Sequence, residues 1–106
     1  MADAPRVIKP GRVREFAARH PDATPSLERW LEAAEAARWR NLVDVRQVFR
    51  SADEVKVASG RTVVVFNIAG NQFRLITAIH YDVGKVFVLM LLTHAEYGKD
   101  RWKDAL

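Results

Sequence analysis

The spacing of apolar residues changes once along the chain, just after Asp53. Before this point, apolar side chains recur every three or four residues, which is the period of a helix with one buried face. After it, apolar and polar side chains alternate or run together, which is typical of strands. The sequence therefore predicts helices in the first half and an antiparallel sheet in the second, which is an α+β fold.

Two helices are predicted in the first half. The first begins at Pro10, because proline suits the first helical position, and it ends at Pro21. The second begins near Thr24 as the N-cap, with Pro25 at the first helical position. A short third helix is one interpretation of residues 41–49. Its inward-facing residues would be Val45, Val48 and Phe49.

The second half predicts a meander of strands separated by turns. A short strand is expected around Val55 and Val57, followed by strands at 61–68 and 72–81. The run 86–92 is apolar on both faces, so it should be a central strand that is covered on both sides. A charged segment follows this run and predicts a C-terminal helix. The helices are expected to pack on one face of the sheet.

The 106 residues suit a single domain over 1–106, with residues 1–5 as a loose, flexible N-terminal tail. There is no cysteine, so neither a disulfide nor a thiolate metal site can form. No apolar run approaches the roughly 20 residues of a membrane helix, and the first residues lack the apolar core of a signal peptide. We therefore expect a cytoplasmic protein without membrane contact. A net charge of +4, carried mostly by arginine, favours a polyanionic partner without requiring one.

Residues 93–97, between the last strand and the last helix, carry the most chemistry. Thr93 and Glu96 have the Thr-x-x-Glu spacing of a capping box, which explains both residues structurally. His94 and Tyr97 lie three apart in the first turn and share a helix face, and capping does not explain them. They are candidates for proton transfer. The alternatives are that Tyr97 belongs to the core and that His94 points to water.

Arg74 is the third candidate, because a charge on a largely apolar strand face lies either at a sheet edge or in a cleft. If it converges with His94 and Tyr97, the three supply a cation and two proton carriers. Metal-free RNA cleavage needs these parts to deprotonate the 2′-OH, to protonate the leaving 5′ oxygen and to stabilise the phosphate. His20, His80 and His94 do not have metal-ligand spacing, and no glycine-rich phosphate loop occurs. No metal or cofactor is expected.

Three tracts carry a family resemblance: 65–75 (VFNIAGNQFRL), 79–82 (IHYD) and 92–97 (LTHAEY). Their order and spacing resemble the HigB toxins, which belong to the RelE/ParE-like toxins of type II toxin–antitoxin systems. The resemblance covers residues 7–103. It implies two helices packed on a curved antiparallel sheet with a C-terminal helix. It also implies a metal-independent, ribosome-dependent mRNA endoribonuclease that inhibits translation.

The resemblance implies partners and site residues as well. A helix-turn-helix antitoxin of the HigA type would neutralise the protein, mRNA and the ribosome would be its targets, and operator DNA would be bound only through the toxin–antitoxin complex. Asn71 and Arg74 match the family's Asn-x-x-Arg motif, and His94, Glu96 and Tyr97 match its terminal motif. The catalytic candidates are Arg74, His94 and Tyr97. The RNA-binding candidates are Lys56, Arg61, Asn71 and His80.

Three positions depart from the family pattern. Ala69 stands in the hairpin where glycine is usual, and Gly98 stands where aspartate is usual. Leu89 stands in the strand where relatives often carry arginine. Because that arginine would bind phosphate, Leu89 leaves two alternatives open. One is a non-catalytic, ParE-like interaction module, and the other is a degenerate toxin that only binds its antitoxin.

Overall fold

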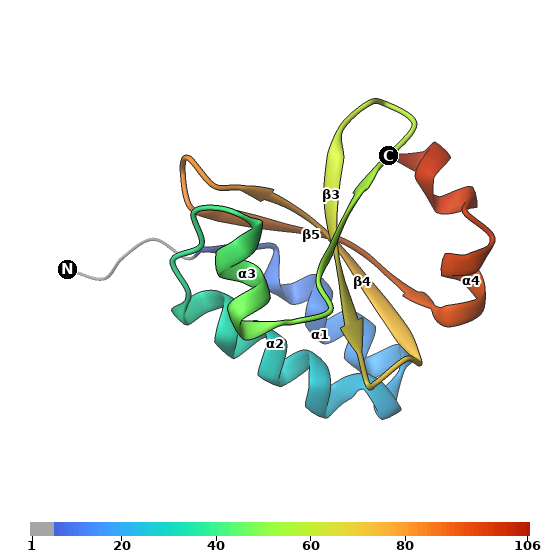
Figure 1. Cartoon of the computed structure of the whole chain (residues 1–106). Helices are drawn as coiled ribbons and strands as arrows, with labels where there is room; N and C mark the ends of the chain where they lie inside the picture. The colour runs from blue at the N-terminus through green and yellow to red at the C-terminus, as the bar shows by residue number, and fades with distance from the viewer. Residues whose placement is uncertain (1–5) are drawn as a thin grey trace.

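The computed structural model describes residues 6–106, so the tail expected at 1–5 lies outside the described residues. The elements in chain order are β1 (Val7–Ile8), α1 (Pro10–Arg19), the 3₁₀ helix η1 (Pro21–Ala23), α2 (Thr24–Ala36), α3 (Leu42–Val48), β2 (Asp53–Lys56), β3 (Thr62–Ile68), β4 (Phe73–His80), β5 (Lys85–Thr93), α4 (His94–Gly98) and the 3₁₀ helix η2 (Arg101–Ala105). The predicted α+β class is confirmed, with helices in the first half and the sheet in the second (Figure 1).

Over the described residues, the sheet has the strand order β1-β5-β4-β3-β2. Strands β2 to β5 form the predicted antiparallel meander. The short strand β1 was not expected, and it pairs in parallel with the start of β5 through Val7↔Val86 and Ile8↔Phe87. β5 is thus second from the edge rather than central, and the edge beyond Phe87 has no strand partner among residues 6–106. The apolar composition of β5 reflects the covering of both its faces, as predicted, and does not require strand partners along both its edges.

A bulge interrupts the pairing of β4 with β5. Ile76 pairs with Met90, but its neighbour Thr77 pairs with Val88, so Leu89 between them has no partner on β4. Such a bulge re-aims the side chains that follow it. Leu89 and Met90 both pack in the core on one face of the sheet, where regular alternation would have separated them.

Arg12, from α1, satisfies the backbone at this bulge. Its Nη1 donates to the carbonyl oxygens of Val88 at 3.2 Å and Leu89 at 3.1 Å. The pairing of β1 with β5 ends at Phe87, so within residues 6–106 β1 does not extend to these carbonyls. After the bulge, Leu92 lies directly opposite Arg74. The bulge therefore determines which side chains at the end of β5 lie on the same face of the sheet as Arg74.

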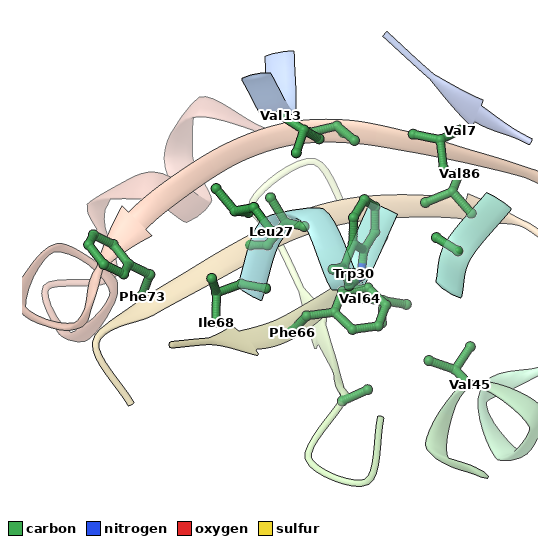
Figure 2. Close-up of a cluster of buried hydrophobic side chains, with 14 of the residues drawn as sticks. Val7, Val13, Leu27, Trp30, Val45, Val64, Phe66, Ile68, Phe73 and Val86 are labelled. Atoms are coloured by element: carbon green, nitrogen blue, oxygen red, sulfur yellow. The ribbon is translucent and has the colours of Figure 1, made fainter. Parts of the chain in front are cut away.

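The larger core lies between one face of the sheet and helices α1, α2 and α3 (Figures 1 and 2). Trp30 of α2 is completely buried, and its ring meets the edge of Phe66 at a centroid distance of 5.4 Å. Leu27 and Ala34 complete the buried stripe of this helix. The two rings carry much of the apolar area that holds the helical layer on the sheet.

A smaller core covers the opposite face of the sheet. Trp102 of η2 packs there with Val63, Val65 and Ile76, all of them buried. The expectation that the helices share one face is therefore wrong for the C-terminal segment, which crosses to the other side (Figure 1). The reason is that β3 and β4 are apolar on both faces, so both faces need a cover.

The helix boundaries confirm some predictions and correct others. Pro10 is the first residue of α1, and the short helix predicted within 41–49 exists as α3. Thr24, however, is not an N-cap: η1 runs directly into α2, and the Thr24 hydroxyl instead donates to the Ala17 carbonyl at 3.2 Å. Val48 is also wrong as an inward residue. It is 52 % exposed, because α3 ends there and only Val45 is fully buried.

Candidate functional site

Arg74 begins the site, close to the hairpin that joins β3 to β4. Its Nη1 donates to the carbonyl oxygens of Asn71 at 3.2 Å and Phe73 at 3.1 Å. The side chain is therefore folded back against its own hairpin. Together with a contact to His94, three of the five guanidinium N–H groups are engaged. Within residues 6–106, the other two have no acceptor and can serve a ligand.

His94 is the first residue of α4, and its ring is exposed. Its Nδ1 lies 3.4 Å from Arg74 Nη2, and its backbone N–H donates to the Gln72 carbonyl at 2.9 Å. A guanidinium can only donate hydrogen bonds, so a hydrogen bond here requires the tautomer in which Nδ1 is the acceptor. The end of the β3–β4 hairpin and the start of α4, which are far apart in sequence, are thus in contact.

The predicted capping box fixes the start of α4. The Thr93 hydroxyl accepts from the Glu96 backbone N–H at 3.2 Å, and Glu96 Oε1 accepts from the Thr93 N–H at 2.9 Å. This second hydrogen bond is the main reason why the pKa of Glu96 is lowered. Both residues therefore have a structural role. The box sets the direction in which His94 leaves the strand.

Tyr97 lies beneath the Arg74 guanidinium, whose Cζ is 5.5 Å from the ring centroid. The ring also stacks on Trp102 at 5.3 Å and 19°, and Trp102 Nε1 donates to the Tyr97 carbonyl at 3.1 Å. Burial raises the pKa of Tyr97, and the nearby Asp53 raises it further, so the phenol stays protonated at neutral pH. Sequence reasoning missed Trp102. The available signal was a large apolar side chain within a charged terminal segment.

The structure thus brings together Arg74, His94 and Tyr97, which we call the candidate cluster. Of the predicted RNA-binding residues, only Asn71 is beside it, through its carbonyl contact with Arg74. His80 is six residues further along β4, roughly 20 Å away at 3.3 Å per residue, and its ring packs against Phe87 at 5.0 Å.

Lys56 and Arg61 lie on either side of the turn between β2 and β3. Lys56 pairs with Thr62, five residues along β3 from the level of the candidate cluster. It alternates with Val55, which packs in the smaller core, so its side chain leaves from the opposite face of the strand. The Arg61 backbone carbonyl accepts a hydrogen bond from the Val57 backbone N–H. The structure does not bring these two cations to the candidate cluster.

Among the pockets of the described residues, one lies near the candidate cluster and a larger one lies far from it. A pocket of about 260 Å³ lies beside α4, with Leu92 and Trp102 among its apolar residues and Lys99 and Arg101 among its cations. A larger one, of about 580 Å³, lies between α1 and α2 on the other side of the sheet. The smaller pocket adjoins α4, so it is the nearer of these two to the candidate cluster.

Residues 6–106 contain no group of three His, Cys, Asp or Glu side chains placed to hold a metal ion. They also contain no helix with the length and apolar character needed to cross a membrane.

This sheet, covered on both faces, with a cationic and aromatic cluster at the end of one hairpin, defines a small α+β protein of the RelE-like type. The chain belongs to the HigB toxin family, described as the RelE-like toxic component of a toxin–antitoxin system, whose family model matches residues 23–100. The resemblance seen in the three sequence tracts is therefore confirmed. The protein is the toxin of such a pair and has an antitoxin as its partner. No curated protein matches the chain.

Proposed function

We propose that this toxin is a metal-independent, ribosome-dependent mRNA endoribonuclease that inhibits translation. The observation that carries the proposal is the contact of 3.4 Å between Arg74 Nη2 and His94 Nδ1, with Tyr97 beneath the same guanidinium. A cation, an imidazole and a phenol within reach of one another are the groups needed to cleave RNA through its own 2′-OH. Because the chain belongs to a toxin family, we take the RNA that it cleaves to be mRNA.

Arg74 holds the scissile phosphate in this proposal. Two carbonyl oxygens and His94 orient its guanidinium before any substrate arrives. The remaining N–H groups then donate to the phosphate oxygens, on which negative charge builds in the transition state. A preorganised cation stabilises that charge without reorganising during the reaction.

His94 acts as the general base. In the free protein its Nδ1 accepts from Arg74, as the contact of 3.4 Å indicates. A bound phosphate competes for that guanidinium, and the competition releases Nδ1 to accept the proton of the 2′-OH. Substrate binding and activation of the base are then a single event.

Tyr97 supplies the proton for the leaving 5′ oxygen. Because its pKa is raised, mainly by burial, the phenol keeps its proton at neutral pH. Stacking on Trp102 fixes the ring, so the hydroxyl has a defined direction. A protonated, immobilised phenol is a suitable donor to a developing alkoxide.

The partners follow from the same proposal. The antitoxin is of the helix-turn-helix HigA type, and operator DNA is bound only through the toxin–antitoxin complex. Asn71 contacts RNA beside the candidate cluster, while Lys56, Arg61 and His80 contact RNA or ribosomal RNA away from it. A net charge of +4 supports binding to such a polyanion. The site of action is the cytoplasm, where translation takes place.

The test is mRNA cleavage in a translating extract without antitoxin. We expect His94→Ala and Tyr97→Phe each to lower the cleavage rate by roughly 10²- to 10⁴-fold, the usual contribution of a positioned acid or base. Arg29→Ala is the matched control, since Arg29 is an exposed arginine whose side chain is hydrogen-bonded, within residues 6–106, to Ser26. Cleavage by the two site variants at the wild-type rate would falsify the assignment.

Leu89 is the observation that favours the alternative, a non-catalytic ParE-like module or a toxin that only binds its antitoxin. It is half-buried at the bulge and packs in the smaller core, so this point of β5 offers no cation. The same extract decides between them. Intact mRNA together with inhibited DNA supercoiling would identify a ParE-like action, and the absence of both would identify a protein that binds its antitoxin alone.

A further inference from the structure

A second basic site lies at the other end of the sheet. It is a pocket of about 350 Å³, here called the basic pocket. Its main lining residues are Arg6, Arg38, Arg40, Lys85, Trp39 and Tyr81. Lys85 and Thr93 are the two ends of the nine-residue strand β5. The basic pocket is therefore about 25 Å from the start of α4, at roughly 3.3 Å per residue.

Several parts of the fold build this pocket. Arg6 precedes β1 and is held by its Nη1, which donates to the Glu35 carbonyl at 2.8 Å. Arg38 and Arg40 lie in the connection between α2 and α3, and Lys85 begins β5. Convergence of four cations from three separate segments is not the pattern of a single solvated helix face.

Two residues that line the pocket, Trp39 and Tyr81, carry buried polar atoms without a partner among the described residues. Trp39 Nε1 and Tyr81 Oη are inaccessible to solvent and make no hydrogen bond to residues 6–106. Trp39 is 7 % exposed and is fixed by its stack on Phe66 at 6.1 Å. A buried donor without a partner is unfavourable, so an acceptor is expected there. An adjoining cavity of about 20 Å³, also lined by Trp39, has room for one water that would relay such a bond.

The nearby charges limit what the ligand can be. Asp44 is engaged by Arg40 at 3.2 Å, and Glu54 is the other carboxylate that acts on Tyr81. The pocket lining itself contains no carboxylate among its described residues. The guanidinium and ammonium groups of the lining only donate hydrogen bonds, and arginine forks match the spacing of phosphate oxygens. We propose that the basic pocket binds a phosphate group.

The phosphate can belong to an RNA backbone or to a small free phosphate. Both present the same tetrahedral oxygens, so affinity for each must be measured. The inference does not depend on the cleavage proposed for the candidate cluster, because the two sites share no residue. An acidic protein segment would be a different kind of partner, and a single carboxylate fits a set of four cations less well than a phosphate does.

The three tryptophans provide separate reporters in the intact, ¹⁵N-labelled chain. The indole N–H signal of Trp39 reports on the basic pocket, that of Trp102 on the candidate cluster, and that of Trp30 on the core. Pyrophosphate and a short 2′-O-methyl RNA, which cannot be cleaved through its 2′ oxygen, are the probes. We expect saturable movement of the Trp39 signal, with the Trp30 signal unmoved.

Each outcome has a distinct meaning. Movement of Trp39 with the RNA at lower concentration than with pyrophosphate identifies backbone phosphate, and movement with pyrophosphate alone identifies a small phosphate. Movement of Trp102 without Trp39 would overturn the basic pocket and leave the proposed function standing. Equal movement of Trp39 with polyglutamate would also overturn it, in favour of an acidic protein partner.

A charge-matched pair of variants completes the test. Removing two pocket cations with Arg38→Gln/Arg40→Gln should weaken binding of the 2′-O-methyl RNA about tenfold and reduce its salt dependence by roughly 0.7 per lost phosphate contact. Arg29→Gln/Arg50→Gln removes the same charge from exposed positions outside the pocket and should change affinity less than about twofold. Equal weakening by both pairs would show that only net charge matters and would sink the inference.

Discussion

Two single residues, Ala69 and Gly70, adopt a left-handed backbone conformation that most residues avoid. Ala69 has a φ of 53° and is followed by Gly70 with a φ of 66°, so two left-handed residues in succession close the hairpin between β3 and β4. Only Gly70 suits that conformation without steric cost. The departure of Ala69 from the glycine usual in the family is thus a local strain, and it lies next to the turn that orients Arg74.

Replacing Ala69 by glycine should therefore stabilise the protein. The relief of a left-handed alanine, roughly 1–2 kcal/mol, exceeds the added chain entropy of glycine, roughly 0.4–1 kcal/mol. We expect Ala69→Gly to raise the free energy of unfolding by up to about 1 kcal/mol, measured from urea melts. The matched change is Ala18→Gly, in the last turn of α1, which should instead lower stability, by up to about 1 kcal/mol. A loss of stability in Ala69→Gly would show that the turn is not strained.

Whole elements depend on contacts that no local pattern reveals, and the bulge in β5 is the clearest case. The two Arg12 hydrogen bonds to its carbonyl oxygens join α1 to the open edge of the sheet. Arg12→Ala should lower the free energy of unfolding by about 1–2 kcal/mol, since both carbonyls then lose a charged donor. Arg14→Ala, an exposed neighbour without such bonds, should cost less than about 0.5 kcal/mol. Equal losses of unfolding free energy in the two variants would mean that water satisfies the Val88 and Leu89 carbonyls as well as Arg12 does.

The same contrast explains how much could be predicted from the sequence. The capping box rests on two residues three apart, and Pro10 marks a helix start, so both predictions needed only local information. The contact between Arg74 and His94 depends on the register of β4 with β5, which a one-residue bulge shifts. Sequence spacing could nominate these two residues but could not place them together. Nothing local marked Leu89 as the unpaired residue.

The molecule as a whole depends on covering both faces of a single sheet. The helical layer is extensive, whereas the smaller core is closed largely by Trp102 from the last described turn. Trp102→Ala should lower the free energy of unfolding by about 3–5 kcal/mol, the range for a large aromatic truncated in a core. It should also slow the RNA cleavage that we propose, because Tyr97 loses its stack.

Trp102→Phe separates these two effects. It keeps the aromatic stack but removes the indole N–H that donates to the Tyr97 carbonyl. We expect a loss of only about 1 kcal/mol in unfolding free energy and nearly full cleavage activity. Thermal or urea unfolding together with the translating extract measures both. If Trp102→Ala unfolds no more easily than Trp102→Phe, then η2 does not hold the second face.

The bulge also affects where the chain can tolerate the insertion or deletion of a residue. β5 contains one residue more than β4 can pair, so the loss of a single codon there can be absorbed by straightening the strand. Met90 would follow Val88 in regular pairing, and His94 would keep its place beside the hairpin. A deletion inside β4 has no such reserve, because a one-residue slip would turn every later side chain to the opposite face. Insertions and deletions are therefore tolerated unequally in two adjacent strands, and the spare residue of β5 lies only five positions before the imidazole.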